Sequence, residues 1–509
     1  MIALDGTSLT LTDLARIAYD DAPVTLTRDA VARVRASRDV VDAHVASGKP
    51  VYGVNTGFGA LADVAIPPGQ LSALQLNLLR SHAAGVGEPL PVPTVRALMA
   101  LRANVLAKGF SGIRLETLEA LIGMLNAGVH PRVPARGSVG ASGDLAPLAH
   151  LALVLVGEGQ ATLGAAEPGP AALGGAEALA RAGLRPVALA PKEGLALING
   201  TQASAAVLAL AVVGGARLAR AADIAAAMSI DALRGSIHPF EARLHAARPV
   251  PGQAASAANL WRLTAGSRIN ASHERCGKVQ DAYALRCAPQ VHGAMREALG
   301  FAHRLVEIEA NAATDNPMVF IDGGDIVSGG NFHGAPVALA ADTLTIGLAQ
   351  LATISERRTN RLLTADESGL PAFLTRTSGL SSGLMMAHVT AAALTSEIKT
   401  LSHPAAVDTI PTSAGREDHV SMSMGAALKA ARALELARLV VAIELLAACQ
   451  AIDLLAPLTT SAPLERVRRA IRARVPALDA DRPPAPDIEA LAALVATGEL
   501  EAASDVELS

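Results

Sequence analysis

The 509-residue chain has few aromatic side chains, only 2% of the total, although 51% of its residues are hydrophobic. Its core must therefore be filled mainly by alanine, leucine and valine. Alanine and leucine are among the best helix formers, whereas strands favour aromatic and β-branched residues. The composition predicts a mainly α fold built on closely packed helices instead of a β-sandwich.

Cysteine is also scarce, and a targeting segment is not apparent. The three cysteines, Cys276, Cys287 and Cys449, show no CxxC spacing, which predicts structural thiols in a reducing compartment and neither a disulfide framework nor a zinc site. The first residues, MIALDGTSLTLTDLAR, lack the basic and continuous apolar regions of a signal peptide. We therefore expect a cytoplasmic protein.

Charge of one sign is nowhere concentrated. The net charge is −4 and the basic residues are spread along the chain, so a nucleic-acid partner is not expected. The uncharged run at 203–216 is shorter than the roughly 20 apolar residues of a membrane span, and the run LVVAIELLAACQAIDLL contains Glu444 and Asp453. Both runs predict buried core helices and no membrane partner.

The pattern along the chain divides it into three regions. A segment rich in glycine, alanine and proline at 157–193 precedes long apolar periodic stretches, and a proline-rich linker precedes a last amphipathic stretch. We predict an N-terminal region at 1–200, a central bundle of long helices at 201–475 and a peripheral helix at 476–509. A repeat of 20 to 50 residues is not apparent.

The glycine-rich stretch RGSVGASGDLAPLAH begins at Arg136. It is not a phosphate-binding loop, because Asp144 stands where that loop needs lysine, and the glycine spacing does not fit a dinucleotide fold. It is not a G-x-S-x-G nucleophile elbow either. Ser142 or Asp144 could simply cap the following helix, which would accept Pro147 in its first turn.

A second interpretation of this stretch is chemical. The nitrogen of Gly143, unhindered by any Cβ, can approach the carbonyl carbon of Ala141 and close a five-membered ring. Loss of water and dehydration of Ser142 then leave an exocyclic methylene. Such a group is an electrophile that accepts an amine, and no ordinary side chain supplies one.

Two of only three tyrosines, Tyr52 and Tyr283, lie in polar segments where a core aromatic residue is less expected. Gln280, Tyr283 and Arg286 recur at three-residue spacing, which would place them on one helical face ending before Pro289. A phenol acts as an acid or a base near neutral pH only if its surroundings lower its pKa, and Arg286 is one source of the required positive charge. The planar guanidinium of Arg286 also suits a substrate carboxylate.

The stretch SVGASGDLAPLAH resembles the signature of the aromatic amino acid ammonia-lyases, whose Ala-Ser-Gly becomes 4-methylidene-imidazole-5-one (MIO). Nearly the whole chain shares the resemblance, through the stretches YGVNTGFG, SHAAGVG, EGLALINGTQAS, QDAYALRCAPQVHG, TDNP, GNFHG, SERR and EDHVSM. It implies MIO formed from Ala141, Ser142 and Gly143 without an external cofactor. It further implies a central helical bundle, a smaller N-terminal region that carries the MIO loop, and a D2 homotetramer with shared active sites.

The resemblance also implies roles for single residues. Asn199, which alone would be read as an Asn-Gly turn residue, aligns with an asparagine that contacts the substrate and the MIO region, and Phe332 aligns with a residue lining the pocket. The pair Ser81-His82 is similar to the pair found in family members that act on histidine. At the same two positions, members that act on phenylalanine typically have Phe-Leu, and those that act on tyrosine have His-Leu. His82 can exchange a hydrogen bond with an imidazole.

Glu417, in REDHVSM, resembles a glutamate of the histidine-specific members that faces the imidazole. Many members have glutamine immediately before it, where this chain has Arg416. An inward-pointing Arg416 would lower the pKa of Glu417 and weaken it as a base.

The expected reaction is elimination of ammonia from L-histidine to give trans-urocanate. Tyr52 is the first candidate for the base, Tyr283 the second and Glu417 the third. Two alternatives stay open at this point. One is an MIO enzyme that acts on tyrosine or phenylalanine as an ammonia-lyase or aminomutase, and the other is a non-catalytic helical assembly whose loop never cyclises.

Overall fold

The computed structural model describes residues 1–57, 59, 64–164, 172–273, 277 and 279–509; Cys276 lies outside them. The chain divides into two compact units. Unit 1 comprises 1–213, 303–342 and 404–428, and unit 2 comprises 214–302, 343–403 and 429–509. The described strands are short and form small sheets of two or three strands, while helices make up most of both units, which confirms the mainly α prediction.

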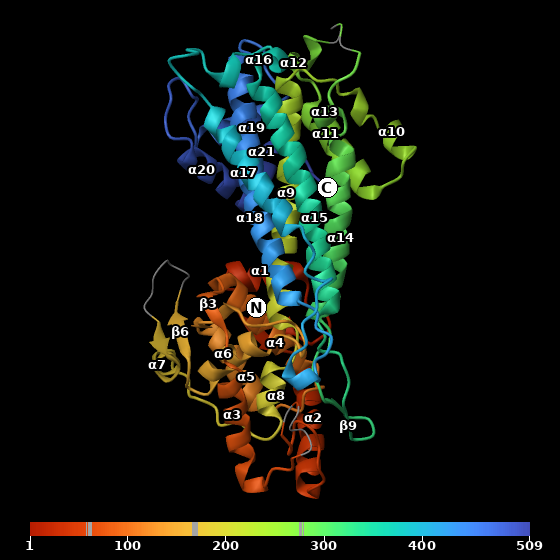
Figure 1. Ribbon diagram of the computed structural model, residues 1–509, viewed down its shortest axis with the longest axis vertical. Coiled ribbons are helices and arrows are strands. Elements are labelled where there is room, and N and C mark those ends of the chain that lie inside the picture. Colours follow the sequence, from red (N-terminus) through yellow and green to blue (C-terminus); the bar gives the residue numbers. More distant parts are fainter. Residues whose placement is uncertain (58, 60–63, 165–171, 274–276, 278) are drawn as a thin grey trace. The chain divides into compact units, whose positions relative to one another are not determined.

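Unit 1 contains short helices and all the described strands (Figure 1). Its helices are α1 (Leu11–Tyr19), α2 (Arg28–Ser47), α3 (Leu71–His82), α4 (Val92–Ala107), α5 (Leu115–Asn126), α6 (Leu145–Leu155), α7 (Gly175–Arg181) and α8 (Glu193–Ile198). Its strands are β1 (Ile2–Leu4), β2 (Val24–Leu26), β3 (Val86–Pro89), β4 (Val129–Pro131), β5 (Pro134–Arg136), β6 (Gln160–Leu163), β7 (Leu173–Gly174), β8 (Met318–Phe320) and β9 (Asp325–Val327). The strands β1 and β2 pair in parallel, and the pairs β3-β5, β4-β6, β6-β7 and β8-β9 are antiparallel.

Three helices of unit 1, namely α3, α6 and α8, pack against one another. Helix α8 is buried along its whole length, and α6 is almost entirely apolar, with Pro147 in its first turn as predicted. Burial on several sides fixes the positions of their ends. These ends carry His82 at the end of α3, Asp144 at the start of α6 and Asn199 at the end of α8.

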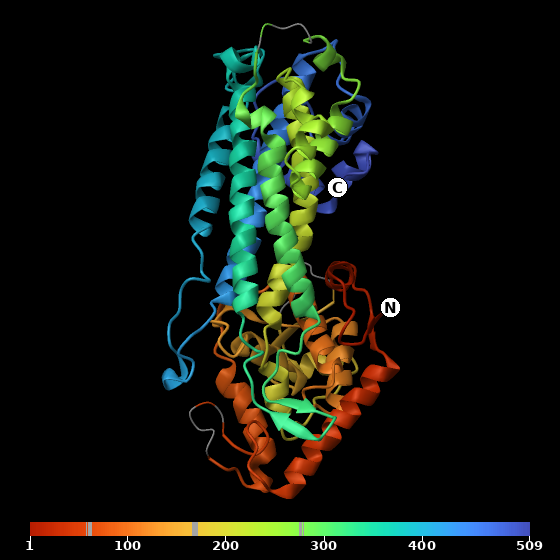
Figure 2. The same ribbon diagram turned by 90° about the vertical axis from the view of Figure 1, so that its right-hand side faces the viewer.

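Four long helices contribute to unit 2, and the parts that belong to it lie side by side (Figures 1 and 2). They are α9 (Gln202–Ala232), α14 (Ala288–Ala310), α15 (Ala335–Leu363) and α18 (Ser423–Leu454). The other helices of this unit are α10 (Ala242–Ala246), α11 (Pro251–Thr264), α12 (Arg268–Ala271), α13 (Tyr283–Arg286), α16 (Ala365–Ser368), α17 (Met385–Leu401), α19 (Ala462–Arg472), α20 (Ala485–Thr497) and α21 (Glu499–Ser504). The central helical bundle is therefore as predicted.

The division into units differs from the predicted boundaries at 200 and 475. Four of the five unit boundaries fall within α9, α14, α15 and α18, and the fifth lies after α17. The segments 303–342 and 404–428 belong to unit 1. The predicted peripheral helix at 476–509 is also part of unit 2, because Leu500 is fully buried and Glu501 forms an ion pair with Arg220 at 2.5 Å. Helical periodicity shows which residues are buried but not where a helix changes its packing partners.

Two helices, α9 and α15, are long and apolar enough to cross a membrane. Their most apolar windows are 72% and 67% buried inside the protein. Burial against other protein segments is the pattern of core helices, so their apolar character is explained by packing.

A buried ion pair joins three long helices in unit 2. The guanidinium of Arg358 donates from Nε to Oε1 of Glu444 at 2.5 Å and from Nη2 to Oε2 at 2.9 Å, and both side chains are fully buried. Ser229 and Ser355 donate to the same carboxylate at 2.7 and 2.6 Å. Every oxygen of Glu444 is therefore paired twice, and α9, α15 and α18 are held in one register.

Replacing Glu444 with glutamine is expected to lower the free energy of unfolding by about 3–5 kcal/mol, because the guanidinium of Arg358 would stay buried without a counter-charge. Urea denaturation monitored by circular dichroism measures this loss. The control is Glu435→Gln on the same helix, where the carboxylate pairs with Arg432 at 3.0 Å but is 58% exposed. That change is expected to cost less than about 1 kcal/mol, and equal losses in the two variants would contradict the prediction.

Candidate active site

The Ala141-Ser142-Gly143 segment lies in unit 1, between β5 and α6. Gly143 pairs with Gly200 in a parallel bridge, and the amide of Asp144 donates to the carbonyl of Gly200 at 2.7 Å. Gly143 has φ +70°, and a Cβ on it would lie 2.2 Å from that carbonyl oxygen. Only glycine fits here, because a side chain would have to overlap the Gly200 backbone.

The carboxylate of Asp144 does not cap the helix that follows it. Asp144 occupies the position before α6, but its side chain makes no capping bond. It accepts hydrogen bonds from Ser138 Oγ at 2.7 Å and from Ser204 N and Oγ at 2.7 and 2.8 Å. Burial raises the pKa of Asp144 above its usual value, although these bonds partly oppose the rise. The helix-cap interpretation is therefore wrong for both side chains, because Asp144 ties the loop to the start of α9 and Ser142 points elsewhere.

Asn199 follows α8 and contacts the predicted MIO segment. Its Nδ2 donates to the carbonyl of Ser142 at 3.0 Å, and its own carbonyl accepts from Arg102 Nη1 at 2.8 Å. Its Oδ1 is buried and has no hydrogen-bond partner among the described residues. Asn199 has extended φ and ψ of −88° and 111°, so it belongs to the break between two helices. The Nδ2 group of Asn199 therefore holds the loop, and its Oδ1 atom is available as a hydrogen-bond acceptor.

Glu417 lies against Ser142. Its Oε1 accepts from Ser142 Oγ at 2.8 Å, and its Oε2 accepts from Thr412 Oγ1 at 2.5 Å and from Ser413 Oγ at 2.8 Å. Burial alone would raise the pKa of Glu417. The opposite effect of the hydrogen bonds from Thr412, Ser142 and Ser413, together with the charge of His82, is larger, so the pKa lies below its usual value. Arg416, the predicted source of such a shift, is exposed; the hydroxyl groups and His82 account for it instead.

His82 is the last residue of α3 and is half-buried. Its Nδ1 lies 2.9 Å from the carbonyl oxygen of Leu78 and 3.1 Å from Ser81 Oγ. Because a carbonyl oxygen only accepts, Nδ1 carries the proton, and in the neutral ring Nε2 is an acceptor. The end of α3 thus fixes one face of the imidazole.

Tyr52 and Phe332 are half-buried in loops of unit 1. The phenol oxygen of Tyr52 accepts from the amide of Gly59 at the long distance of 3.5 Å. Beside Phe332, the ring of His333 stacks on that of His419 with centroids 5.7 Å apart, and His333 Nε2 donates to the carbonyl of His419 at 3.1 Å. The loop of Phe332 therefore adjoins the segment that follows Glu417.

The predicted trio of Gln280, Tyr283 and Arg286 lies in unit 2 and is brought together. Arg286 Nη2 donates to Gln280 Oε1 at 2.9 Å, and Arg286 Cζ lies 4.7 Å from the centre of the Tyr283 ring. Tyr283 is 70% exposed. Gln280 and Arg286 line a pocket of about 600 Å³, and the Nε of Arg286 is buried without a hydrogen-bond partner among the described residues.

The local structure of this trio differs from the single helical face that was predicted. Helix α13 contains only Tyr283–Arg286, so Gln280 lies in the irregular segment before it. Pro289 is the second residue of α14 and does not end the preceding turn. Proline is tolerated there because the first amide groups of a helix need no partner within it.

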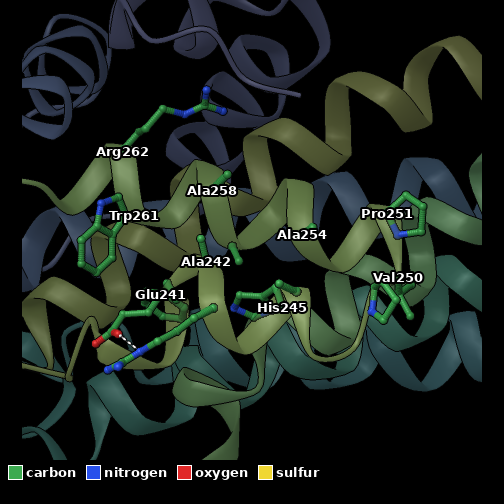
Figure 3. A pocket seen from close by; sticks show the side chains of 14 residues that line it. Glu241, Ala242, His245, Val250, Pro251, Ala254, Ala258, Trp261 and Arg262 are labelled. Atoms are coloured by element: carbon green, nitrogen blue, oxygen red, sulfur yellow. Dashed lines mark ion pairs between the residues drawn. The ribbon is translucent and has the colours of Figure 1, made fainter.

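A second pocket of unit 2 contains none of the predicted site residues. Its volume is about 810 Å³, and it lies beside α10 and α11, with Trp261, Val250 and His245 in its wall (Figure 3). The ion pair between Glu241 and Arg243, at 2.6 Å, is at the same place. We do not assign the candidate active site to it.

Several residues that build the site were not predicted from the sequence, namely Thr412, Ser413, Arg102, Ser138 and Ser204. The first two form hydrogen bonds with the Glu417 carboxylate, and the other three with Asn199 or Asp144. Serine and threonine are frequent in loops, so nothing in their local sequence marks them. Among the described residues, no group of three or more histidine, cysteine, aspartate or glutamate side chains is arranged to hold a metal ion.

Comparison with known proteins gives one family. A family model described as aromatic amino acid lyase matches residues 9–473. A protein of Anaeromyxobacter sp. (strain K) named histidine ammonia-lyase is 57% identical over 506 residues, covering 98% of this chain and 99% of the relative. A protein of the same name from Myxococcus xanthus is 53% identical over 503 residues, covering 99% and 98%.

Solved structures agree in fold. The crystal structure of histidine ammonia-lyase from Trypanosoma cruzi has a TM-score of 0.92 and 46% identity, covering 99% of this chain and 94% of that chain. The tyrosine aminomutase from Streptomyces globisporus has a TM-score of 0.94 and 38% identity, covering both chains completely. This chain thus has a fold similar to those of both a lyase and an aminomutase. The fold alone therefore does not identify the substrate, which depends on the residues of the site.

Proposed function

Because the chain belongs to the aromatic amino acid lyase family, we infer that it is a carbon–nitrogen lyase that eliminates ammonia from L-histidine to give trans-urocanate. Full-length relatives at 50–57% identity share the name histidine ammonia-lyase. The assignment of histidine as the substrate rests on two residues: Glu417, which contacts Ser142, and His82, whose charge acts on Glu417. An imidazole offers one N–H donor and one acceptor nitrogen; the Glu417 carboxylate accepts from the N–H group, and His82, when its ring carries both protons, would donate from Nε2 to the other nitrogen.

The same pair disfavours an aromatic ring without nitrogen. A phenyl group would leave the Glu417 carboxylate and the His82 imidazole without partners, at a cost of about 1–3 kcal/mol for each buried polar group left unsatisfied. A site that must satisfy polar groups therefore rejects phenylalanine more strongly than an apolar pocket would reject histidine.

We propose that Ala141, Ser142 and Gly143 cyclise to MIO and that no external cofactor is needed. The residues fit such a group: Gly143 has a backbone conformation that favours glycine, and Asn199 binds the Ser142 carbonyl. The Oδ1 of Asn199 is a buried acceptor without a partner among the described residues. Once formed, the ring would supply an electrophilic methylene that accepts the substrate amine. The buried Oδ1 would offer that amine a hydrogen bond.

We propose the remaining roles from side-chain charge and from the family resemblance. Arg286 would bind the substrate carboxylate through its planar guanidinium, whose Nε has no hydrogen-bond partner among the described residues. Because the pKa of Glu417 is lowered, its carboxylate is a weak base and suits a hydrogen-bond acceptor better than an acceptor of the β-proton. This supports a tyrosine as the base, with Tyr52 before Tyr283.

We propose a D2 homotetramer in which each active site takes residues from more than one chain, working in the cytoplasm. The exposure of Tyr283, which is 70% accessible in the single chain, supports this assembly. A side chain with a catalytic task lies in a site closed to solvent, and a neighbouring chain that covers Tyr283 would provide that closure.

Supplying the purified protein with L-histidine, L-tyrosine and L-phenylalanine in turn tests the substrate. We expect ultraviolet absorbance of urocanate with L-histidine and a value of kcat/KM at least about 100-fold lower for the other two, because unpaired polar groups oppose them. Chromatography of the tyrosine and phenylalanine reactions would detect a β-amino acid if the protein were an aminomutase. Faster turnover of either, or no turnover of any, would refute the histidine assignment.

A further inference from the structure

The loop from Thr412 to Glu417 is closed by its own backbone. The amide of Thr412 donates to the carbonyl of Glu417 at 3.0 Å, and the amide of Glu417 donates back at 3.4 Å. Between them, Ser413 and Ala414 have positive φ of 50° and 54°, followed by Gly415 at 80°. Left-handed conformations of non-glycine residues cost free energy and persist only where the surrounding structure imposes them. This loop therefore holds Glu417 in an imposed orientation.

The two oxygens of the Glu417 carboxylate have different surroundings. Oε2 accepts both hydroxyl groups of the loop, from Thr412 at 2.5 Å and from Ser413 at 2.8 Å. Among the residues that the structure describes, Oε1 accepts only the hydroxyl of Ser142, at 2.8 Å. Loss of the Ser142 hydroxyl during ring formation would leave Oε1 without that donor, while Oε2 would keep both of its own.

We propose that Thr412 and Ser413 are positioning residues for substrate recognition: by occupying Oε2 they aim Oε1 of Glu417 at the N–H group of the substrate imidazole. The inference rests on the proposed function and deepens it. In the unmodified chain, the hydroxyl of Ser142 takes the place of that N–H donor. Without the loop hydroxyls, the carboxylate could rotate and present either oxygen, and part of the affinity for imidazole would be lost to this freedom.

The charged groups around Glu417 do not supply this orientation. His82, at the end of α3, acts on the carboxylate through its charge, and Arg416 and Asp418 are exposed on the same loop. A charge attracts both carboxylate oxygens almost equally, whereas a hydroxyl at 2.5 Å selects one of them. The hydroxyl groups also favour the ionised form, so the carboxylate stays an acceptor as the pH falls.

The first test compares single substitutions in the full-length enzyme. Thr412→Val removes the hydroxyl at nearly constant volume and is expected to raise KM for L-histidine about 10-fold, with Ser413→Ala acting in the same direction. The acidic limb of kcat/KM should move to higher pH, because removing a donor raises the pKa of Glu417. Thr412→Ser restores the donor and should return both values toward those of the unaltered enzyme.

A matched control lies in the same segment. Thr409 accepts a hydrogen bond from the amide of Val420 at 2.9 Å, so Thr409→Val removes a hydroxyl that serves the backbone. This variant should keep KM and the pH profile even if its melting temperature falls. Equal increases of KM in Thr409→Val and Thr412→Val would mean that the hydroxyls only stabilise the loop, and would overturn the proposal.

The second test measures binding without turnover. In a Ser142→Ala background, isothermal titration with L-histidine should give a dissociation constant about 10-fold higher when Thr412→Val is added, and the constant should recover with Thr412→Ser. Unchanged binding would refute the role of Thr412. Failure of the proposed function is a separate result, since the enzyme with Ser142 and Thr412 intact would then produce no urocanate.

Discussion

Ser142→Ala is expected to lower the turnover of L-histidine by at least about 10³-fold, because alanine has no hydroxyl to lose and the electrophilic methylene cannot form. Ultraviolet absorbance of urocanate gives the rate. The substitution removes only the hydroxyl that contacts Glu417 Oε1, and the backbone contacts of Gly143 and Asp144 with Gly200 do not involve that side chain. The variant should therefore fold normally.

Intact mass spectrometry separates this loss of chemistry from a loss of structure. The unaltered protein should be lighter than its sequence requires by two water molecules, whereas the Ser142→Ala protein should have its sequence mass. Ser138→Ala is the matched control for the mass change. It also removes a serine hydroxyl from this loop, because Ser138 Oγ donates to Asp144 at 2.7 Å, but Ser138 does not belong to the cyclising tripeptide. An unshifted mass in active protein, or equal turnover by Ser142→Ala, would remove MIO from the proposal.

Tyr52→Phe is expected to lower kcat by about 10²–10⁴-fold if the Tyr52 phenol removes the β-proton, because general bases contribute effects of that size. The substitution keeps the ring and removes only the oxygen. Turnover of L-histidine under saturating substrate measures kcat, and circular dichroism establishes that the fold persists. Tyr19→Phe, on the exposed end of α1, is the control and should leave kcat unchanged.

Parallel measurements on Tyr283→Phe and Glu417→Gln rank the three candidates. Loss of the base should act on kcat, whereas loss of a residue that reads the imidazole should act mainly on KM. We expect the largest fall in kcat for Tyr52→Phe and a rise in KM for Glu417→Gln. Turnover close to that of the unaltered enzyme in Tyr52→Phe would exclude Tyr52, and the larger fall in kcat between Tyr283→Phe and Glu417→Gln would then identify the base.

Composition and local pattern were sufficient for the fold class, and the family resemblance pointed to the Ala-Ser-Gly tripeptide. A core poor in aromatic residues and rich in alanine and leucine can pack only as close helices, and long apolar periods produced α9, α15 and α18 as expected. The three-residue spacing of Gln280, Tyr283 and Arg286 predicted one helical face. Arg286 does contact the other two side chains, but the residues lie on a short helix and in the irregular segment before it.

Other features required the tertiary structure. Asp144 looked like a helix cap by position, but its carboxylate binds Ser138 and Ser204, because a buried carboxylate takes the best donors that packing brings near it, whatever their sequence distance. Arg416 adjoins Glu417 in the chain yet is exposed. Sequence neighbours in a tight loop point in different directions, so adjacency did not predict pairing.

The sequence by itself, through residue types and the family resemblance, pointed to the groups that we propose for the chemistry: an Ala-Ser-Gly tripeptide, two tyrosines outside the apolar segments and an arginine. Only the tertiary structure decided how these groups are aimed. Ser142 and Glu417 are 275 residues apart, and the hydroxyls of Thr412 and Ser413 acquire a task only when a folded loop sets them on one carboxylate oxygen. The orientation of these side chains depends on packing between distant segments, so it cannot be predicted from the local sequence.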